Sequence, residues 1–434
     1  MKLWKKDKKS DSDLSKIVEQ FTVGRDREFD LLLAEHDVLG SLAHSQMLES
    51  IGLLNKEELN KIHSELNLIL KDIHSGNFKI DSTMEDIHSQ IEWILTQKIG
   101  ETGKKIHSGR SRNDQVLLDI KLYLRAEIKT ISKEVNNLFG QILSLSEKHK
   151  NKLLPGYTHL QIAMPSSFGL WFGAYAESLV DDMEFIQSAY NICNKNPLGS
   201  GAGYGSSFPL NRKSTTELLD FENMNYNVVY AQMTRGKSEK AVAIALSAIA
   251  ATLSKFAYDV CLYMNQNFGF ISFPDELTTG SSIMPHKKNP DVFELIRAKC
   301  NRIQALPNEL TLLINNLPSG YHRDLQLTKE ILFPAINEMQ QCLQMTQFML
   351  QHIEVKNDIL KDEKYAYLFS VERVNELVLQ GISFREAYNT VGNEIENGMF
   401  KANKNLHHTH EGSLGNLCTD EIKQAMKRFH QLYS

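Results

Sequence analysis

The segment at residues 273–289 places a serine close to cationic and amide side chains, a combination that can remove a proton next to a bound anion. Ser281 follows Gly280, which permits backbone angles that other residues resist. Lys287 and Asn289 come next, and a helical pattern begins directly after them. Cations and a helix N-terminus attract small anions, and they could lower the pKa of a serine hydroxyl enough to make it a base. A Ser- and Gly-rich turn with solvated lysines accounts for this segment equally well.

A second polar segment supplies an imidazole. Thr158 and His159 place a hydroxyl and an imidazole side by side. Glu294, in the first turn of the helical pattern after the serine segment, is a carboxylate that could orient that imidazole. A lone histidine is more often structural, so a pairing of His159 with Glu294 requires that the loops converge in the fold.

A third polar cluster stands at the beginning of the longest helical pattern. Ser111, Arg112 and Asn113 offer a fork of donors at a helix start, an arrangement suited to a carboxylate. Ser111 can also cap the first exposed amides of that helix. We therefore predict that this cluster binds an anionic group.

Other motifs that suggest chemistry fail on their spacing. Gly199–Gly205 lacks the GxGxxG pattern and follows no strand, and Gly100–Lys104 lacks the spacing of a phosphate-binding loop. His407–His410 has no spaced cysteine or acidic ligands around it, so a polar surface loop is a better interpretation than a metal site. The chain contains no GxSxG motif, which disfavours a serine hydrolase.

The composition is that of an ordinary globular protein. Hydrophobic residues make up 42% and charged residues 23% of the 434 residues, a length that fits two or three domains. The net charge of −5 provides no general basic field for nucleic acid. Acidic residues follow the basic cluster Lys5–Lys9, which we interpret as a solvated edge rather than a nucleic-acid or membrane arm.

Several features favour a cytoplasmic enzyme. The five cysteines form no CxxC pair and are odd in number, as expected of reduced and mostly buried thiols. The first residues lack the apolar region of a secretory signal. The most apolar stretch, Ala241–Ala251, is too short to span a bilayer.

Apolar residues spaced three or four apart predict an all-α fold. Five long helical patterns occur, at residues 113–150, 168–193, 237–268, 292–317 and 325–353. Helices of this length favour an elongated antiparallel bundle, and Pro334 is expected to kink the last of them. The third pattern is apolar on more than one side, which predicts burial on every side; a bundle shared between subunits is one way to achieve it.

The connections and flanks complete the predicted organisation. Long loops rich in Gly, Pro, Ser and Thr are expected at residues 154–167, 197–212 and 273–289, and loops of this length are usually functional or disordered. We predict three domains. They are an N-terminal helical domain at residues 1–105, a central long-helix bundle at residues 106–355, and a small C-terminal helical domain at residues 356–434.

These polar segments together resemble those of the argininosuccinate lyase family, within the fumarase/aspartase superfamily. Ser281–Pro290 is similar to the superfamily signature GSSxMPxKxNP, and Ser108–Val116, which reads SGRSRNDQV, is the most specific match to the family. Narrower similarities lie at Pro155–Gln161, at Glu85–His88 and around Asp324–Gln326. The resemblance extends from about Glu35 to Glu386 and implies a fumarase/aspartase-like fold.

The resemblance implies cleavage of argininosuccinate to arginine and fumarate by anti β-elimination, in arginine biosynthesis. Ser281 would be the base, and Lys287 would stabilise the dianion that forms, together with Asn289. His159, paired with Glu294, would act on the leaving-group side or bind a water. No metal or organic cofactor is implied. The residues that would bind the charged ends of the substrate are Ser111, Arg112, Asn113, Thr158, Asn289, Tyr321, Gln326 and Lys329.

The family also implies a homotetramer with shared active sites. The His159 loop, the segment Ser111–Asn113 and the Ser281 loop would reach each site from three different chains. A closed assembly of this kind would bury the wide apolar faces of the central helices.

The sequence departs from the family pattern at several places. Leu3–Asp7 stands where the family commonly has LWGGRF, and Ile162–Pro165 replaces part of its HLQRAQP motif. His286 replaces a glutamine of the signature loop, as in adenylosuccinate lyases. The family's SDRD segment is absent, which leaves Arg235 or Lys237 to replace its substrate contact.

Two alternatives stay open on these residues. Adenylosuccinate lyase or another fumarate-releasing lyase of the superfamily is favoured only by His286. A catalytically idle bundle protein, like the lens delta crystallins that resemble this family, is disfavoured by the intact Ser281, Lys287, His159 and Glu294.

Overall fold

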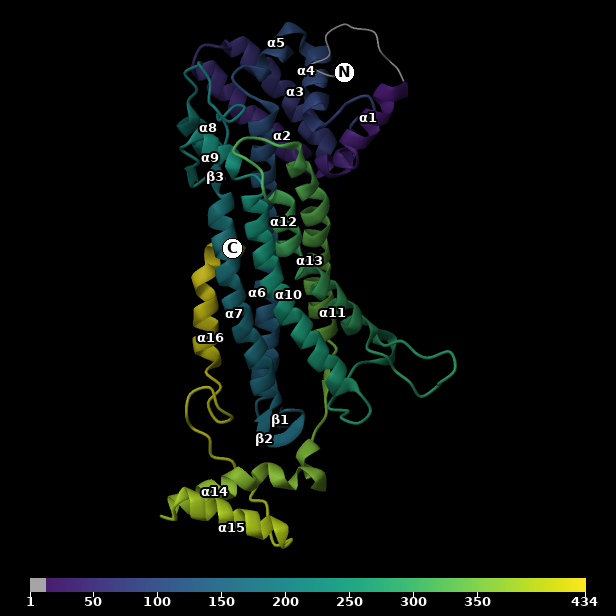
Figure 1. Cartoon of the computed structure of the whole chain (residues 1–434), viewed down its shortest axis with the longest axis vertical. Helices are drawn as coiled ribbons and strands as arrows, with labels where there is room; N and C mark the ends of the chain where they lie inside the picture. Colours follow the sequence, from purple (N-terminus) through teal and green to yellow (C-terminus); the bar gives the residue numbers. More distant parts are fainter. Residues whose placement is uncertain (1–12) are drawn as a thin grey trace. The chain divides into compact units, whose positions relative to one another are not determined.

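The computed structural model describes residues 13–434. Helices make up 66% of the structure, so the predicted all-α class is confirmed (Figure 1). The basic cluster Lys5–Lys9 and the departure at Leu3–Asp7 lie outside the described residues. All five cysteines are free thiols, and three of them, Cys193, Cys300 and Cys342, are buried.

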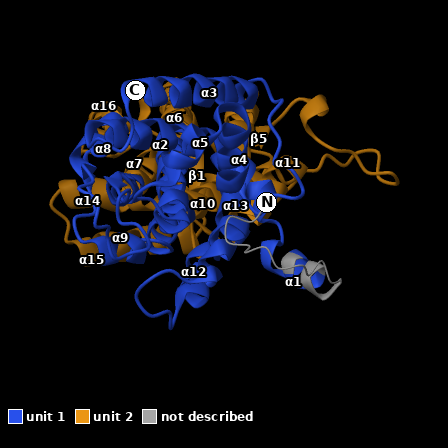
Figure 2. Ribbon diagram, turned by 90° about the horizontal axis from the view of Figure 1, so that it is seen from above, with its two compact units in different colours: residues 1–131, 185–248, 302–339 blue, residues 132–184, 249–301, 340–434 orange. Residues whose placement is uncertain are grey.

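The chain divides into two compact units (Figure 2). Unit 1 comprises residues 1–131, 185–248 and 302–339, and unit 2 comprises residues 132–184, 249–301 and 340–434. Several long helices contribute residues to both units. This division does not follow the boundaries predicted at residues 105 and 355, and the three-domain organisation stays a prediction.

The long helices lie where the apolar spacing predicts them. α6 (Arg112–Lys148) and α7 (Phe168–Cys193) agree closely with their patterns, and α10 (Lys237–Met264) ends slightly earlier than expected. α13 (Thr328–Leu350) begins after a short 3-10 helix, η3 (Arg323–Leu327), and contains Pro334. The apolar stripe that predicts α6 is buried in unit 1 at Leu117, Ile120, Leu124, Ile128 and Ile131.

The fourth predicted helix is interrupted. Residues 292–317 form α11 (Asp291–Ile303) and α12 (Leu306–Ile314) instead of one continuous helix. Pro307 lies in the first turn of α12, where its missing N–H removes no helical hydrogen bond. The apolar spacing continues across the break and therefore conceals it.

The segment predicted as the first long loop is a β-hairpin. β1 (Leu153–Thr158) pairs antiparallel with β2 (Gln161–Ser167). His159 and Leu160 connect the strands with φ angles of 55° and 60°, as in the two-residue turns that match strand twist. Pro155 and Pro165 lie opposite each other in the register, and prolines within the strands concealed this hairpin from the sequence pattern.

Unit 1 contains a set of packed helices near the N-terminus (Figure 1). They are α2 (Asp26–Ser50), α3 (Lys56–His74), α4 (Ile87–Ile99) and α5 (Glu101–Lys104). Asn55 and Glu58 form a capping box at the beginning of α3. Their buried core includes Val38, Leu48, Ile62, Leu66, Ile87 and Leu95.

The remaining elements are short. The α-helices are α1 (Asp13–Val23), α8 (Arg212–Leu218), α9 (Val228–Met233), α14 (Ser370–Leu379), α15 (Phe384–Glu396), α16 (Thr419–Met426) and α17 (His430–Tyr433). The strands are β3 (Lys195–Asn196) paired with β4 (Asn223–Met224), and β5 (Ile271–Ser272) paired with β6 (Glu354–Val355). The other 3-10 helices are η1 (Lys105–His107), η2 (Asp275–Leu277), η4 (Ile359–Lys361), η5 (Glu363–Phe369) and η6 (Lys427–Phe429).

Within residues 13–434, α10 is the one helix long and apolar enough to cross a membrane by length and composition. The expectation that the most apolar stretch, Ala241–Ala251, is too short to span a bilayer is therefore wrong by length and composition. The buried core helix of a soluble protein has the same length and composition, and 56% of the apolar window of α10 is buried.

Candidate active site

A pocket of about 210 Å³ lies in unit 1. Its lining comes from α2, the beginning of α4, the beginning of α6, Arg235, and the segment from Tyr321 into α13. The lining residues are Asp26, Asp30, Glu85, Asp86, His88, Arg112, Asn113, Val116, Arg235, Tyr321, Arg323, Gln326 and Lys329. Acidic and basic groups therefore surround the same space, which suits a ligand that itself carries both charges.

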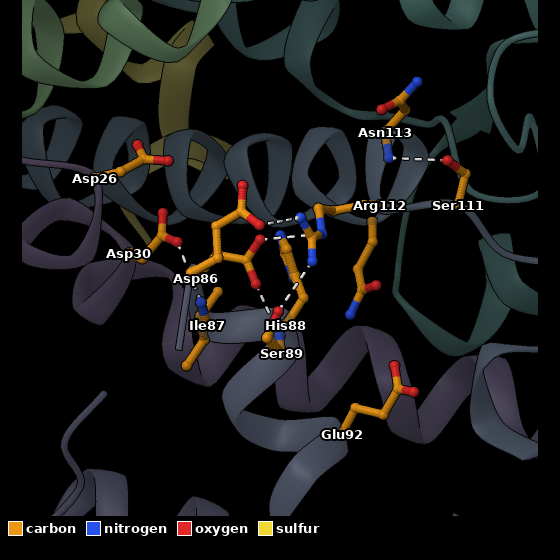
Figure 3. A network of polar contacts seen from close by, with 12 residues as sticks. Asp26, Asp30, Asp86, Ile87, His88, Ser89, Glu92, Ser111, Arg112 and Asn113 are labelled. Atoms are coloured by element: carbon orange, nitrogen blue, oxygen red, sulfur yellow. Dashed lines mark hydrogen bonds and ion pairs between the residues drawn. The ribbon is translucent and has the colours of Figure 1, made fainter. Parts of the chain in front are cut away.

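Arg112 is fixed by acidic neighbours at the edge of this pocket (Figure 3). Its Nη1 lies 3.2 Å from Glu85 Oε2 and its Nε lies 3.1 Å from Asp86 Oδ2. Its Nη2 donates to Ser89 Oγ at 3.0 Å. An arginine offers five N–H donors, so these contacts orient the guanidinium and leave donors for a bound anion.

The helix start that carries Arg112 is itself anchored. The backbone N–H of Ser111 donates to Asp114 Oδ1 at 2.8 Å, and the N–H of Asn113 donates to Ser111 Oγ at 3.2 Å. Ser111 thus caps α6 as predicted. Asp114 Oδ2 also accepts the N–H groups of Gly199 and Gly201, at 2.9 and 2.8 Å. The glycine-rich loop, excluded above as a dinucleotide site, therefore binds the carboxylate at the base of α6.

Lys329 lies among carboxylates in the pocket wall. Its Nζ is 2.6 Å from Asp30 Oδ1 and 2.5 Å from Asp26 Oδ1. Burial opposes the charge of Lys329, but the two aspartates outweigh it and raise the lysine pKa. Lys329 is therefore a fixed cation. Burial likewise raises the pKa of Asp26 to about 6.

The segment from Tyr321 to Gln326 forms another wall. Gln326 Nε2 donates to the carbonyls of Thr22 and Val23, at 3.0 and 3.3 Å. Arg323 Nη2 donates to the carbonyl of Thr22 at 2.8 Å. These contacts join the end of α1 to η3, and they place the amide of Gln326 beside the pocket.

Of the two candidates for the missing SDRD contact, Arg235 lines this pocket and Lys237 does not. Arg235 is buried, with Nε 2.9 Å from Glu239 Oε1 and Nη2 donating to the carbonyl of Leu325 at 2.9 Å. Its Nη1 is buried without a hydrogen-bond partner among the residues of the described chain. Lys237 instead lies 5.2 Å from the ring centre of Tyr230. The geometry favours Arg235.

His88 also lines the pocket, and it was not among the site residues expected from the sequence. Its Nδ1 lies 3.1 Å from Asp37 Oδ1 and 3.6 Å from Asp119 Oδ2. Burial opposes its charge, but Asp37, then Asp86 and Asp30, raise the His88 pKa. The Glu85–His88 motif was the available signal for His88. Asp37 and Asp119 stand singly in helical patterns and carried no signal.

The predicted base, Ser281, belongs to unit 2, in the connection between η2 and α11. Its Oγ accepts the backbone N–H groups of Met284 and Ile283, at 3.1 and 3.4 Å. The connection is closed at its base by an antiparallel bridge between Thr279 and Asn289, whose N–H donates to the carbonyl of Thr279 at 2.8 Å. Backbone amides directed at a serine oxygen stabilise its alkoxide form, and the role of Ser281 as the base stays a prediction.

The other catalytic candidates also belong to unit 2. Lys287 is exposed in the same connection, and Glu294 lies in the first turn of α11. Thr158 ends β1 and His159 occupies the exposed turn of the hairpin. Within residues 13–434 of this single chain, His159 and Glu294 form no hydrogen bond or ion pair with each other. Their pairing stays a prediction.

Five of the predicted substrate-binding residues are thus together in one pocket of unit 1. They are Arg112, Asn113, Tyr321, Gln326 and Lys329. Ser111 is adjacent through its contact with Asn113. The predicted residues that belong to unit 2 are Thr158, His159, Ser281, Lys287, Asn289 and Glu294. The roles of all these residues stay predictions.

Comparison with known proteins gives a consistent result. A family model described as lyase matches residues 9–305. An argininosuccinate lyase of Bacteroides fragilis is 61% identical over 427 residues, which covers 98% of this chain and 95% of the relative. An argininosuccinate lyase of Thermotoga neapolitana is 40% identical over 390 residues, covering 90% of this chain and 97% of the relative.

A solved structure shares the fold. The crystal structure of EDDS lyase in complex with formate superposes with a TM-score of 0.80 at 21% identity, covering 95% of this chain and 90% of that chain. At this identity the similarity establishes the helical fold alone.

Proposed function

The chain belongs to the argininosuccinate lyase family, and on this premise we propose that its pocket binds argininosuccinate and that the Ser281 loop cleaves it to arginine and fumarate. The chain is a carbon–nitrogen lyase whose function is in arginine biosynthesis. The observation that carries the residue assignment is the pocket of unit 1, where Arg112, Arg235 and Lys329 lie among acidic side chains. Argininosuccinate carries three carboxylates together with amino and guanidinium groups, so it requires partners of both signs.

The elimination assigns a step to each group of the Ser281 loop. Ser281 Oγ takes a proton from the succinyl carbon next to a carboxylate, and the C–H electron pair moves into that carboxylate. Lys287 and Asn289 stabilise the resulting dianion, a contribution that can reach several kcal/mol. The electron pair then forms the double bond of fumarate while the carbon–nitrogen bond breaks. The two backbone amides at Ser281 support its role as the base.

The leaving nitrogen departs as the guanidinium of arginine. It requires a proton or an ordered water on its side of the substrate. We assign this role to His159, oriented by Glu294 of another chain. Thr158 lies next to His159 and would bind the substrate together with Ser111, Arg112, Asn113, Tyr321, Gln326 and Lys329.

We also propose that the chain functions as a cytoplasmic homotetramer with shared active sites. Large apolar side chains are exposed on the long helices of unit 2, among them Tyr258 on α10, Leu295 on α11, and Met345 and Phe348 on α13. Leu295 and Met345 line the same pocket, and apolar side chains that gather on one face are typical of an interface. A closed symmetric assembly would bury them. The reaction as written needs no metal ion and no organic cofactor.

The experiment that tests the function compares two substrates. The chain is supplied with argininosuccinate or with adenylosuccinate, and fumarate release is followed by its ultraviolet absorbance, before and after dialysis against a chelator. We expect fumarate from argininosuccinate only, at a rate that the chelator does not change. Preferential cleavage of adenylosuccinate would show that adenylosuccinate, and not argininosuccinate, is the substrate. Release from neither substrate would favour the idle bundle protein.

A further inference from the structure

Beneath the pocket, a histidine contacts two fully buried aspartates that the elimination does not use. His88 on α4 has its Nδ1 beside Asp37 on α2 and Asp119 on α6. Both aspartates are 0% exposed, and His88 is 5% exposed and lines the pocket. One atom from each of the three groups lies within 4.8 Å of the others. The cluster therefore links the wall of the pocket to the core of unit 1.

The carboxylate oxygens of this cluster outnumber the hydrogen-bond donors available to them. Asp37 Oδ1 accepts from Gln115 Nε2 at 2.6 Å and lies against His88 Nδ1. Asp37 Oδ2 and both oxygens of Asp119 are buried and accept no hydrogen bond from the described residues, and Asp119 Oδ2 lies 3.6 Å from His88 Nδ1. All three are acceptors as long as both carboxyls are ionised, and unpaired buried acceptors are costly. A single proton on Asp119 would convert one of these acceptors into a donor.

The charges around the cluster agree with such a proton. Burial raises the pKa of Asp119 well above its ordinary value, and the neighbouring Asp37 raises it further. The pKa of Asp37 is lowered, because His88 and Arg110 outweigh its burial. The titratable and charged groups that face the cluster are Asp30 on α2, Asp86 directly before α4, Glu92 on α4, His107 on η1, Arg110 between η1 and α6, and Arg112 at the beginning of α6.

Most of these neighbours already have partners. Asp30 is bound by Lys329, and Asp86 is bound by Arg112. Asp37 is therefore the carboxylate that can balance a charge on His88. Arg110 favours an ionised Asp119, but burial and the neighbouring Asp37 outweigh it and keep the pKa of Asp119 raised.

We propose that Asp119 is a carboxylic acid that donates its proton to Asp37, and that this carboxyl pair positions His88 as an imidazolium in the wall of the pocket. His88 then presents a fixed cation to an anionic group of the substrate. Asp37 and Asp119 are positioning residues, since they act through His88. This inference rests on the proposed function only in naming what the pocket binds.

The first test uses the parent protein. A protonated buried carboxyl gives a carboxylic C=O band in the infrared spectrum at neutral pH. We expect this band in the parent and its loss in Asp119→Asn. Histidine labelled with ¹⁵N, with His88 assigned by comparison with His88→Asn, should show an imidazolium at neutral pH. A neutral His88 in the parent, or the same infrared spectrum in parent and Asp119→Asn, overturns the proposal.

A matched pair of variants provides the second test. An amide has the shape of a protonated carboxyl and can donate to Asp37, so Asp119→Asn should leave kcat and KM within a few-fold of the parent. Asp37→Asn removes the charge that supports His88. We expect it to raise KM by at least about tenfold, the factor that corresponds to one pKa unit. It should also shift the basic limb of the kcat/KM profile to lower pH, because His88 then loses its proton more easily. Equal defects in the two variants contradict the proposal.

A cation bound by His88, Asp37 and Asp119 is the rival interpretation of the same cluster. It requires an ionised Asp119 and a neutral His88. The metal content of the purified parent and of the purified Asp119→Asn variant then decides between the bound cation and the shared proton. A stoichiometric metal that is lost in Asp119→Asn establishes the cation and rejects the shared proton. These spectra are informative even if argininosuccinate is not cleaved, so failure of the inference and failure of the function are distinguishable.

Discussion

The backbone N–H of Met284 donates to Ser281 Oγ at 3.1 Å. A hydroxyl that accepts an amide is better able to lose its own proton, because the amide stabilises the alkoxide. The contact lies within a connection that is exposed from Ser282 to Lys288. The serine thus has a partner inside its own loop while that loop remains accessible.

We predict that Ser281→Ala loses turnover by ~10²–10⁴-fold, the typical effect of removing a positioned acid or base. The matched control is Ser282→Ala, which changes an exposed serine in the same loop and should retain most activity. Steady-state kinetics and thermal unfolding of both variants check the prediction. Turnover of Ser281→Ala within a few-fold of the parent removes Ser281 as the base.

Lys287→Met should lower kcat/KM, because it deletes a cation next to the developing dianion. Arginine should not restore activity, since a planar fork does not replace a point charge. The control is Lys288→Met, because the neighbouring Lys288 forms an ion pair with Asp275 and should be dispensable. An unchanged kcat/KM in Lys287→Met excludes this lysine from the site.

Arg235→Lys should raise KM for argininosuccinate by about tenfold, an effect of roughly 1.4 kcal/mol. Lysine can keep the ion pair with Glu239 but lacks the additional guanidinium donors of Arg235, which lines the pocket. Lys237→Met, outside the pocket lining, is the comparison variant and should bind substrate normally. If Lys237→Met is the variant with the raised KM, the assignment of the missing SDRD contact is reversed.

We predict that buried His44 makes the free energy of unfolding decrease in acid. It is buried, its Nε2 lies 3.0 Å from the carbonyl of Ser108, and burial lowers the pKa of His44 to about 3. In the unfolded chain the pKa of His44 is close to that of a free histidine. The contribution of neutral His44 to the free energy of unfolding is therefore complete above that pKa and is lost as the pH falls toward 3. The loss is about 1.4 kcal/mol for each pH unit in that interval.

The measurement is urea unfolding of the parent and of His44→Gln between pH 7 and pH 4. Glutamine can still donate to the carbonyl of Ser108 but does not titrate. We expect the difference in unfolding free energy between parent and variant to change with pH. Parallel pH dependences would show that His44 is not buried in its neutral form.

The sequence predicted the long helices well because their apolar spacing is repeated many times. The pattern of α6, for instance, is matched by buried side chains from Leu117 to Ile131. The sequence pattern failed at prolines, which occur both at the beginning of helices and within strands. Pro307 begins a helix without interrupting the apolar spacing, and the prolines of the β1–β2 hairpin concealed two strands.

The candidate site was predicted only in part for a similar reason. Arg112 and Lys329 stand in recognisable motifs, and both line the pocket. Asp37 and Asp119 are single acids in helical patterns, and only packing brings them to His88. Sequence spacing describes neighbours along one helix face and says nothing of contacts between three different helices.

We propose that the Ser281 loop of one chain and the His159 turn of another chain act in the same site. Mixing two inactive variants tests it directly. Ser281→Ala chains still supply a native His159, and His159→Asn chains still supply a native Ser281. If the chains assort randomly in a symmetric assembly, roughly a quarter of the sites receive both native groups.

The control mixture combines Ser281→Ala with Lys287→Met. Ser281 and Lys287 belong to the same loop, and every chain in the mixture carries one of the two changes. No site can therefore receive a fully native loop. The measurement is fumarate release from argininosuccinate after co-refolding of each pair, with mixed oligomers verified by two affinity tags. We predict recovery toward a quarter of parent activity for the Ser281 and His159 pair and none for the control pair. Verified mixed oligomers of the first pair that stay as inactive as either variant alone would contradict the shared site.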